Sequence, residues 1–207
     1  KKHITCQYEE DGAERRWTEW GPKEPNARNI TWTELVPGTA ARTCAVDDRL
    51  ENIEPGAFVG LGSLESLKLQ KENTIQYAEG TTSKLQSDHN ALTVLKNGTF
   101  AGLDALSGTL DLSLYGIQSI EPGAFLGMHN LKILLLQSND LTVLQADTFI
   151  GLENLNEVHL GDNYLSLETI EPGAFAGLDN LEGILFLDEM CDSLRATDEL
   201  PPSATCW

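Results

Sequence analysis

The segment 131–152, LKILLLQSNDLTVLQADTFIGL, constrains the fold of this 207-residue chain more than any other feature. Leu134 and Leu136 alternate as in a short strand, a turn is expected at Asn139, and an irregular arm ends at Phe149. Neither a helical period nor a strand period explains the whole spacing. Such a unit cannot bury its apolar side alone, so we expect similar units stacked on both sides of it.

Copies of this unit recur along most of the chain. The clearest shared element is a Phe within IEPGAFVGL, LKNGTFAGL, IEPGAFLGM, LQADTFIGL and IEPGAFAGL, at positions 58, 100, 125, 149 and 175. The spacings from Phe100 onward are 25, 24 and 26 residues, whereas the first gap is 42, one repeat plus an additional segment. The pattern resembles LxxLxLxxNxLxxLxxxxFxxL, the unit of about 24 residues in the extracellular subclass of the leucine-rich repeat family. The resemblance covers about residues 40–194.

The resemblance implies an α/β solenoid, a leucine-rich repeat horseshoe of about seven repeats with a parallel β-sheet on its concave face. The convex side is expected to be mostly irregular or 3-10. We divide the chain into an N-terminal cap (1–39), the repeats (40–190) and a C-terminal cap (191–207). The second repeat is truncated and followed by a polar loop at 70–83, and a third repeat resumes at Leu85.

The register of the first repeat is ambiguous by one residue. Counting back from Leu50 places Thr43 and Ala45 inward, whereas apolarity favours Cys44 and Val46, which we prefer. 

The repeated residues predict two internal columns. The Phe residues are expected to stack on the convex side. Asn90, Asn139 and Asn163 occupy the turn after the strand, where a buried amide can bond backbone carbonyls of adjacent repeats. Other residues replace Asn at this position in three repeats, so we expect an incomplete ladder: Asp48, Tyr115 and Glu189.

The four cysteines lie near the two ends of the chain. They have no CxxC spacing and no clustered His, which argues against a zinc site. The family resemblance implies disulfide-bonded caps, Cys6–Cys44 and Cys191–Cys206, each pairing joining a cap to its own end of the solenoid. Disulfides indicate a secreted protein in an oxidising compartment. The chain has no initiator Met and no signal peptide, so we expect that it begins after processing.

Charge narrows the set of partners. Fourteen basic against 32 acidic residues give a formal net charge of −18, which argues against nucleic acid and against anionic membrane surfaces. No apolar run is long enough for membrane insertion. Solubility is the simplest explanation of the acidity, and a basic partner or weakly bound Ca²⁺ are the alternatives.

The sequence lacks the common catalytic and nucleotide-binding motifs, whereas it contains two motifs for N-glycosylation. The sequence contains no HExxH, GxSxG or P-loop, so we predict neither an enzyme nor a cofactor. The sequons Asn29-Ile-Thr31 and Asn97-Gly-Thr99 predict N-glycosylation at both Asn residues of a secreted glycoprotein.

We predict an extracellular protein-binding module, for recognition or cell adhesion, that uses its concave face. Its partner would be another chain or a copy of itself. The alternative is a structural subunit of an extracellular assembly such as a wall, sheath or appendage. Parallel strands favour the first function, because they present rigid rows of side chains to a partner.

The third, fifth and seventh positions of each repeat are expected to face the concave solvent. In the second to fourth repeats these positions are polar: Ser66, Lys68, Gln70, Lys84, Gln86, Asp88, Thr109, Asp111 and Ser113. Farther along they become apolar, which predicts a binding patch rimmed by Glu157 and Asp162 and centred on Ile133, Leu135, His159, Leu185 and Leu187. The alternative is that the C-terminal cap folds back over Leu185 and Leu187.

Overall fold

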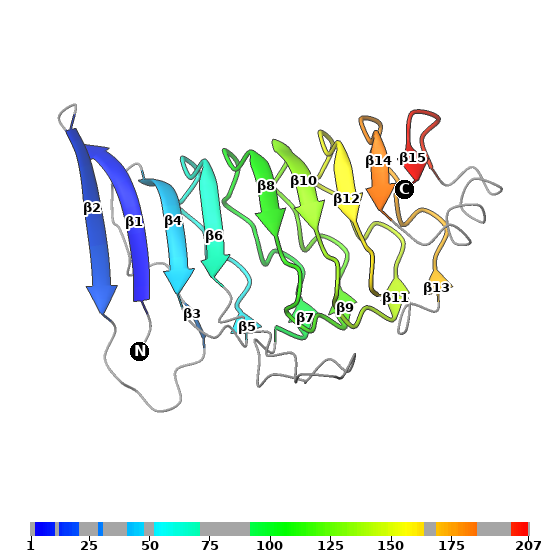
Figure 1. Cartoon of the computed structure of the whole chain (residues 1–207), viewed down its shortest axis with the longest axis horizontal. Coiled ribbons are helices and arrows are strands. Elements are labelled where there is room, and N and C mark those ends of the chain that lie inside the picture. Colours follow the sequence, from blue (N-terminus) through cyan, green and yellow to red (C-terminus); the bar gives the residue numbers. More distant parts are fainter. Residues whose placement is uncertain are drawn as a thin grey trace, which may run out of the picture.

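The structure is a computed structural model that describes residues 3–10, 13–20, 29–30, 41–47, 52–70, 92–163, 169–185 and 200–206. Residues before Ile53, and Lys68 and Gln70, are described by their backbone alone. Figure 1 shows one row of strands running the length of the molecule, with shorter strands along its opposite side. The predicted loop at 70–83, apart from Gln70, lies outside the described residues, as do Lys84, Gln86 and Asp88.

The long row is made of nine strands among the described residues. In spatial order they are β2 (Ala13–Trp20), β1 (His3–Glu10), β4 (Ala41–Asp47), β6 (Ser66–Gln70), β8 (Gly108–Asp111), β10 (Leu131–Leu135), β12 (Glu157–His159), β14 (Gly183–Leu185) and β15 (Thr205–Cys206). From β4 onward every described strand pair is parallel, which confirms the predicted concave sheet.

The opposite side carries two-residue strands joined by turns. They are β3 (Asn29–Ile30), β5 (Asn52–Ile53), β7 (Val94–Leu95), β9 (Ser119–Ile120), β11 (Val143–Leu144) and β13 (Thr169–Ile170). The described residues contain no helix, so the convex side is irregular, as the repeat pattern predicts. 

At the N-terminal end, β1 and β2 form an antiparallel hairpin that continues the sheet, since β1 also pairs antiparallel with β4. The hairpin covers the edge of β4, where the N-terminal cap was predicted, and the bounds of that cap (1–39) stay a prediction. β4 then pairs in parallel with β6, which aligns Cys44 with Leu67 and Val46 with Leu69. Leu67 and Leu69 are buried, so the backbone pairing fits the preferred register of the first repeat.

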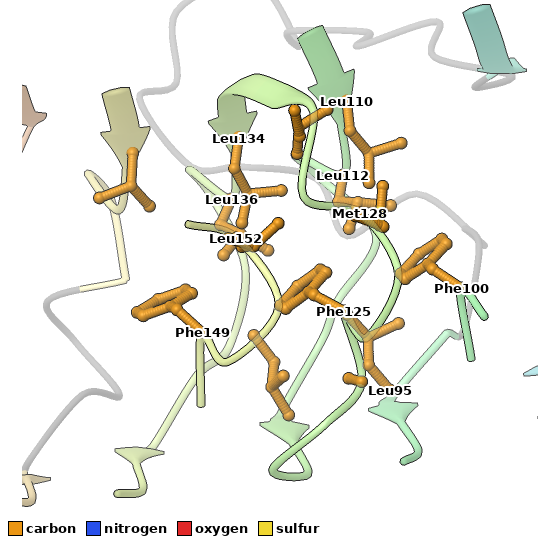
Figure 2. Packing of buried hydrophobic residues seen from close by; sticks show 14 of the residues in the cluster. Leu95, Phe100, Leu110, Leu112, Phe125, Met128, Leu134, Leu136, Phe149 and Leu152 are labelled. Atoms are coloured by element: carbon orange, nitrogen blue, oxygen red, sulfur yellow. The ribbon is translucent and has the colours of Figure 1, made fainter. Parts of the chain in front are cut away.

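The predicted stack of Phe rings forms the centre of the core. Five fully or almost fully buried rings lie one above the next, with centroids 5.4–6.3 Å apart. Figure 2 shows three of them in line, below the leucines that the concave strands turn inward. Stacked rings of this kind add to the free energy of burial, so the column contributes to holding adjacent repeats together.

The same stack corrects the repeat assignment around residues 64–100. Phe58 and Phe100 are 42 residues apart, yet their centroids are 5.9 Å apart, as close as those of Phe100 and Phe125. No complete repeat therefore separates them. The predicted second and third repeats are one coil, in which β6 supplies the strand and residues 92–100 supply the arm. The interpretation as two repeats was wrong because Leu85 and Leu64 both fit a repeat start locally.

A ladder of buried polar groups runs beside the core, as predicted. The Asn139 side-chain amide donates to the Leu112 and Leu136 carbonyls, and its oxygen accepts from the Tyr115 and Ile117 N–H groups. Asn163 repeats the pattern toward the Leu136 and Leu160 carbonyls. Asn90 lies outside the described residues.

Tyr115 continues this ladder instead of interrupting it, which corrects the expectation of a gap. Its hydroxyl donates to the Leu69 carbonyl at 2.9 Å, and Leu69 occupies the repeat position that Leu112 and Leu136 occupy for the two Asn residues. Burial, and secondarily the Asp111 carboxylate, raises the pKa of Tyr115 well above its ordinary value. The phenol therefore stays protonated and remains a donor.

The pairing of β10 with β8 contains one irregularity. The register shifts by one residue between Leu131 and Ile133, so Lys132 on β10 stands opposite no residue of β8. An unpaired residue of this kind is a β-bulge, which bends a strand and locally interrupts its ladder.

Candidate protein-binding surface

The strand register brings the predicted patch residues into two rows across the concave sheet. One row contains Asp111, Leu135, His159 and Leu185, on β8, β10, β12 and β14. The second row contains Thr109, Ile133, Glu157 and Gly183 on the same strands. Neighbouring strands lie about 4.8 Å apart, so the side chains within a row are in reach of one another.

The first row changes character along the sheet. Asp111 is exposed, whereas Leu135, His159 and Leu185 are half-buried and follow one another on three neighbouring strands. Ile133, beside Leu135 on β10, is also half-buried. The buried core positions of these strands are Leu134, Val158 and Ile184, so the core does not require apolar residues in the first row.

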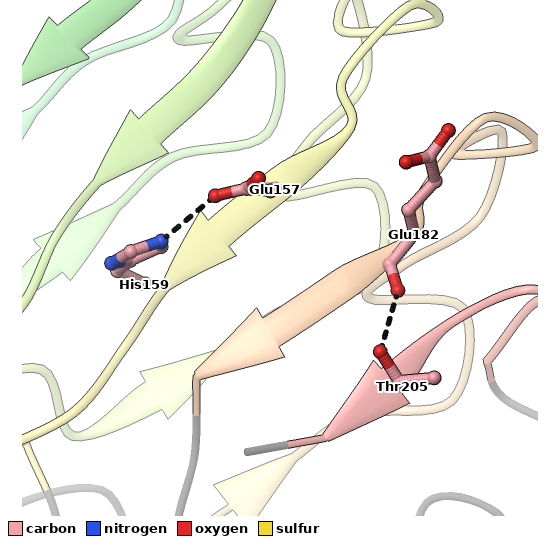
Figure 3. Close-up of polar contacts among 4 residues, drawn as sticks. All are labelled: Glu157, His159, Glu182 and Thr205. Atoms are coloured by element: carbon pink, nitrogen blue, oxygen red, sulfur yellow. Dashed lines mark hydrogen bonds and ion pairs between the residues drawn. The ribbon is translucent and has the colours of Figure 1, made fainter.

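Glu157 and His159 form a pair that the sequence prediction did not identify. Figure 3 shows both side chains projecting from the same face of β12, and the His159 Nε2 lies 3.3 Å from a Glu157 carboxylate oxygen. Residues two apart on a strand share a face, and that spacing was the available signal. Glu157 lies beside Ile133 in the second row, so it belongs to the middle of the patch and not to its rim.

The remaining predicted positions differ in their placement. Asp162 is exposed in the turn after β12, where its carboxylate accepts a hydrogen bond from the Ser138 hydroxyl at 3.2 Å. Leu187 lies outside the described residues, and of the C-terminal cap that would have to fold back over it only residues 200–206 are described. Ser113, predicted to face solvent, is buried, and its N–H and hydroxyl both donate to Asp111. β8 ends at Asp111, so strand alternation no longer sets the direction of the Ser113 side chain.

The far end of the patch is bounded by an additional strand. β15 pairs with β14, and its Thr205 hydroxyl donates to the Glu182 carbonyl at 3.0 Å (Figure 3). β15 thus extends the sheet beside Leu185 by one more strand. Cys206 in β15 is disulfide-bonded, whereas its predicted partner Cys191 lies outside the described residues.

The other predicted cysteine pair stays a prediction that the backbone register fits. Cys6 on β1 stands directly opposite Cys44 on β4. Partners in an antiparallel pair have Cα atoms about 4.5–5.5 Å apart, which lies within the range that a disulfide spans.

The predicted glycosylation sites also stay predictions. Asn97 is exposed, as expected, and its amide donates to the Pro122 carbonyl at 2.7 Å. One amide hydrogen of Asn97 therefore remains for a glycan bond. Asn29 lies in β3, for which only the backbone is described.

Nothing in the described part of the chain forms a metal-binding group of three or more His, Cys, Asp or Glu side chains. No helix within those residues is long and apolar enough to cross a membrane. The concave patch itself offers apolar surface, one His–Glu pair and flanking hydroxyls and carboxylates. These groups suit contact with another protein surface.

The largest exposed apolar side chains lie elsewhere, and the sequence prediction missed them. Val59, Leu126 and Ile150 are 59%, 41% and 43% exposed, and each directly follows a stacked Phe. Their shared position in the repeat was the signal that could have identified them.

Comparisons with known proteins agree with this geometry. The family profile described as "Leucine rich repeat" matches residues 81–141, 108–165 and 129–186, which together span just over half of the chain. A crystal structure of a TLR13–ssRNA13 complex superimposes with a TM-score of 0.51 at 28% identity, over 68% of this chain and 18% of that one.

Three curated relatives share part of the sequence. Podocan from Mus musculus is 34% identical over 58% of this chain, and the transforming growth factor beta activator LRRC32 from Mus musculus is 31% identical over 63%. Toll-like receptor 3 from Boselaphus tragocamelus is 29% identical over 55%. The matched parts cover only 20%, 22% and 14% of these three relatives, respectively.

Proposed function

Because this chain belongs to the leucine-rich repeat family, we propose that it is an extracellular recognition module that binds another protein through its concave face. One observation carries the proposal. Leu135, His159 and Leu185 are neighbours in one row, half-buried, on a face where the corresponding residue of β8 is the exposed Asp111. Apolar residues gathered on an otherwise polar surface usually mark an interface.

Features of the relatives and of the composition support the same function. Two relatives are named as a receptor and as an activator of a growth factor, which are recognition functions of those proteins. The solved TLR13 structure contains single-stranded RNA, whereas this chain has a formal charge of −18. A protein that binds phosphates needs Lys and Arg, so we favour a protein partner over RNA.

The decisive variant is Leu135→Asn. A change to Asp would place two carboxylates side by side, since Leu135 pairs with Asp111, and like charges in neighbouring strands destabilise a sheet. Asn removes the apolar contact without that charge. We expect Leu135→Asn to reduce capture of the partner from native extract at least tenfold, with an unchanged far-UV circular dichroism spectrum.

The matched control is Leu126→Asn, the same substitution at an exposed apolar position outside the concave face. A partner that the wild type and Leu126→Asn capture equally, and that Leu135→Asn loses, would establish the concave patch as its site. Equal capture by all three proteins would contradict the proposal. Light scattering during size-exclusion chromatography would detect polymers, which the structural-subunit alternative requires.

A further inference from the structure

The residue after each stacked Phe forms a second apolar surface, separate from the concave patch. We call it the outer stripe: Val59, Ala101, Leu126, Ile150 and Ala176. The Phe rings repeat every 5.4–6.3 Å, so these adjoining residues follow one another at a similar spacing. The three large residues of the outer stripe, Val59, Leu126 and Ile150, are the exposed large hydrophobic residues of the described part of the chain.

The core does not need the side chains of the stripe, because the buried Phe that precedes each of them already fills the core at that position. The Val59 and Leu126 side chains lie back against their own turns, within 3.5 and 3.1 Å of the positions that a Cβ on Gly56 and Gly123 would occupy. Exposed prolines of the same turns extend the apolar area: Pro55, Pro122 and Pro172. Between 41% and 59% of the surface of each large residue is thus available to a partner.

Carboxylates precede and follow the members of the stripe along the chain, and we call them the acidic border. In the same turns and the segments that follow them lie seven acidic residues: Glu54, Asp104, Glu121, Asp147, Glu153, Glu171 and Asp179. The basic residue among these described turns, Lys96, lies 3.6 Å from Glu54 and offsets one of these charges. Glu121 and Glu171 are held in place, because they accept the Asn97 and Ala146 N–H groups of the preceding repeats.

We propose that the outer stripe binds an amphipathic helix of a partner protein, with an apolar ridge flanked by Lys and Arg. Charge complementarity identifies the cationic flanks. The same argument excludes a second copy of this chain, whose formal charge of −18 would repel the acidic border.

The spacing of the stripe fits a helix better than a strand. A helix presents its apolar face once per turn, about every 5.4 Å, whereas a strand repeats a face about every 6.7 Å. A strand would also need free backbone groups with which to pair. The N–H groups of Gly56, Gly98 and Phe100 already donate to carbonyls of the next repeat. Helix-in-groove recognition uses side chains alone and does not need these groups.

The experiment uses a synthetic peptide helix of about 18 residues, long enough to lie along the whole stripe at about 1.5 Å per residue. The peptide carries Leu on one face and Lys on its flanks, and a scrambled peptide of equal composition lacks the apolar face. Binding to the whole chain is measured by fluorescence anisotropy at physiological salt. The protein is first treated with glycosidase, because a glycan on Asn97 would lie in the turn that contains Ala101.

We expect the double variant Leu126→Asn/Ile150→Asn to weaken binding of the helix at least tenfold. The matched variant Leu135→Asn on the concave face should bind as the wild type does, and the scrambled peptide should bind at least tenfold more weakly. Equal binding of both peptides, or of the wild type and the double variant, would show charge attraction alone and overturn the proposal. So would equal weakening by Leu135→Asn. None of these outcomes bears on concave-face capture, which is measured separately.

Discussion

Two coils of the solenoid reach the same geometry from very different lengths of chain. The regular coil, residues 131–149, ends at Phe149, 24 residues after the preceding Phe of the stack. The interrupted coil, residues 66–100, ends at Phe100, 42 residues after the preceding Phe. The ring of the interrupted coil lies 5.9 and 5.7 Å from its neighbours, and that of the regular coil 6.3 and 5.4 Å. The additional residues therefore leave the stack undisturbed.

The polar ladder gives the same comparison. The Leu136 carbonyl of the regular coil accepts from Asn139 and Asn163, and the Leu69 carbonyl of the interrupted coil accepts from the Tyr115 hydroxyl. The longer phenol reaches the corresponding carbonyl of the coil before it. Stacking thus depends on a few contacts that each coil makes with its neighbours. Chain inserted between those contacts costs only loop entropy, which grows slowly with length.

The largest expected effect tests whether the two coils contribute equally to the stack. Phe100→Ala and Phe149→Ala each remove a buried ring that has a ring on both sides. We expect each to lower the free energy of unfolding by about 3–5 kcal/mol, measured by equilibrium urea denaturation. A loss below about 1 kcal/mol for Phe100→Ala alone would mean that the interrupted coil does not support the stack.

Substitutions in the polar ladder should lower the free energy of unfolding by unequal amounts in the two coils. Asn139→Ala removes a side chain that makes four buried hydrogen bonds, and we expect a loss of about 3 kcal/mol. Tyr115→Phe removes only the hydroxyl bond to the Leu69 carbonyl and keeps the ring, so we expect about 1 kcal/mol. Urea denaturation measures both. If Tyr115→Phe left the free energy of unfolding unchanged, the Tyr115 ring would contribute only by packing, and the ladder of stabilising hydrogen bonds would end at Asn139.

A third comparison concerns how closely the coils approach one another, and its largest effect is smaller than that of Asn139→Ala. A Cβ on Gly102 would lie 2.6 Å from the Phe58 carbonyl oxygen, and one on Gly151 would lie 2.7 Å from that of Phe125. Both residues have positive φ, so we expect Gly102→Ala and Gly151→Ala to cost about 2 kcal/mol each.

Gly127→Ala is the matched control for this pair. It has a similar positive φ but its closest neighbour is the movable Asp104 carboxylate at 3.4 Å, so we expect a loss of about 1 kcal/mol. The difference between the variants isolates the close backbone approach. Should Gly102→Ala cost no more than Gly127→Ala, the interrupted coil would be packed more loosely than the regular one.

Part of the candidate site was predictable from periodicity. Counting positions from the first Leu of each repeat correctly placed Ile133, Leu135 and His159 on one face, since residues two apart on a strand point the same way. The Glu157–His159 contact depends on rotamers, which the pattern does not specify. Ser113 was misplaced because β8 ends at Asp111, so the strand alternation on which the prediction relied does not extend to Ser113.

The sequence by itself determined the family, the parallel sheet, the Phe stack and the Asn ladder, because each is repeated at fixed spacing and each repeat must bury the same positions. Only the tertiary structure decided how many coils those repeats make. Leu64 and Leu85 both satisfy the local pattern, but Phe58 and Phe100 pack directly against each other. The local spacing of apolar residues indicates which positions of a repeat are buried, whereas contacts between coils show which of these residues are neighbours in space. The outer stripe became evident in the same way, since exposure is a property of the packed array and not of one repeat.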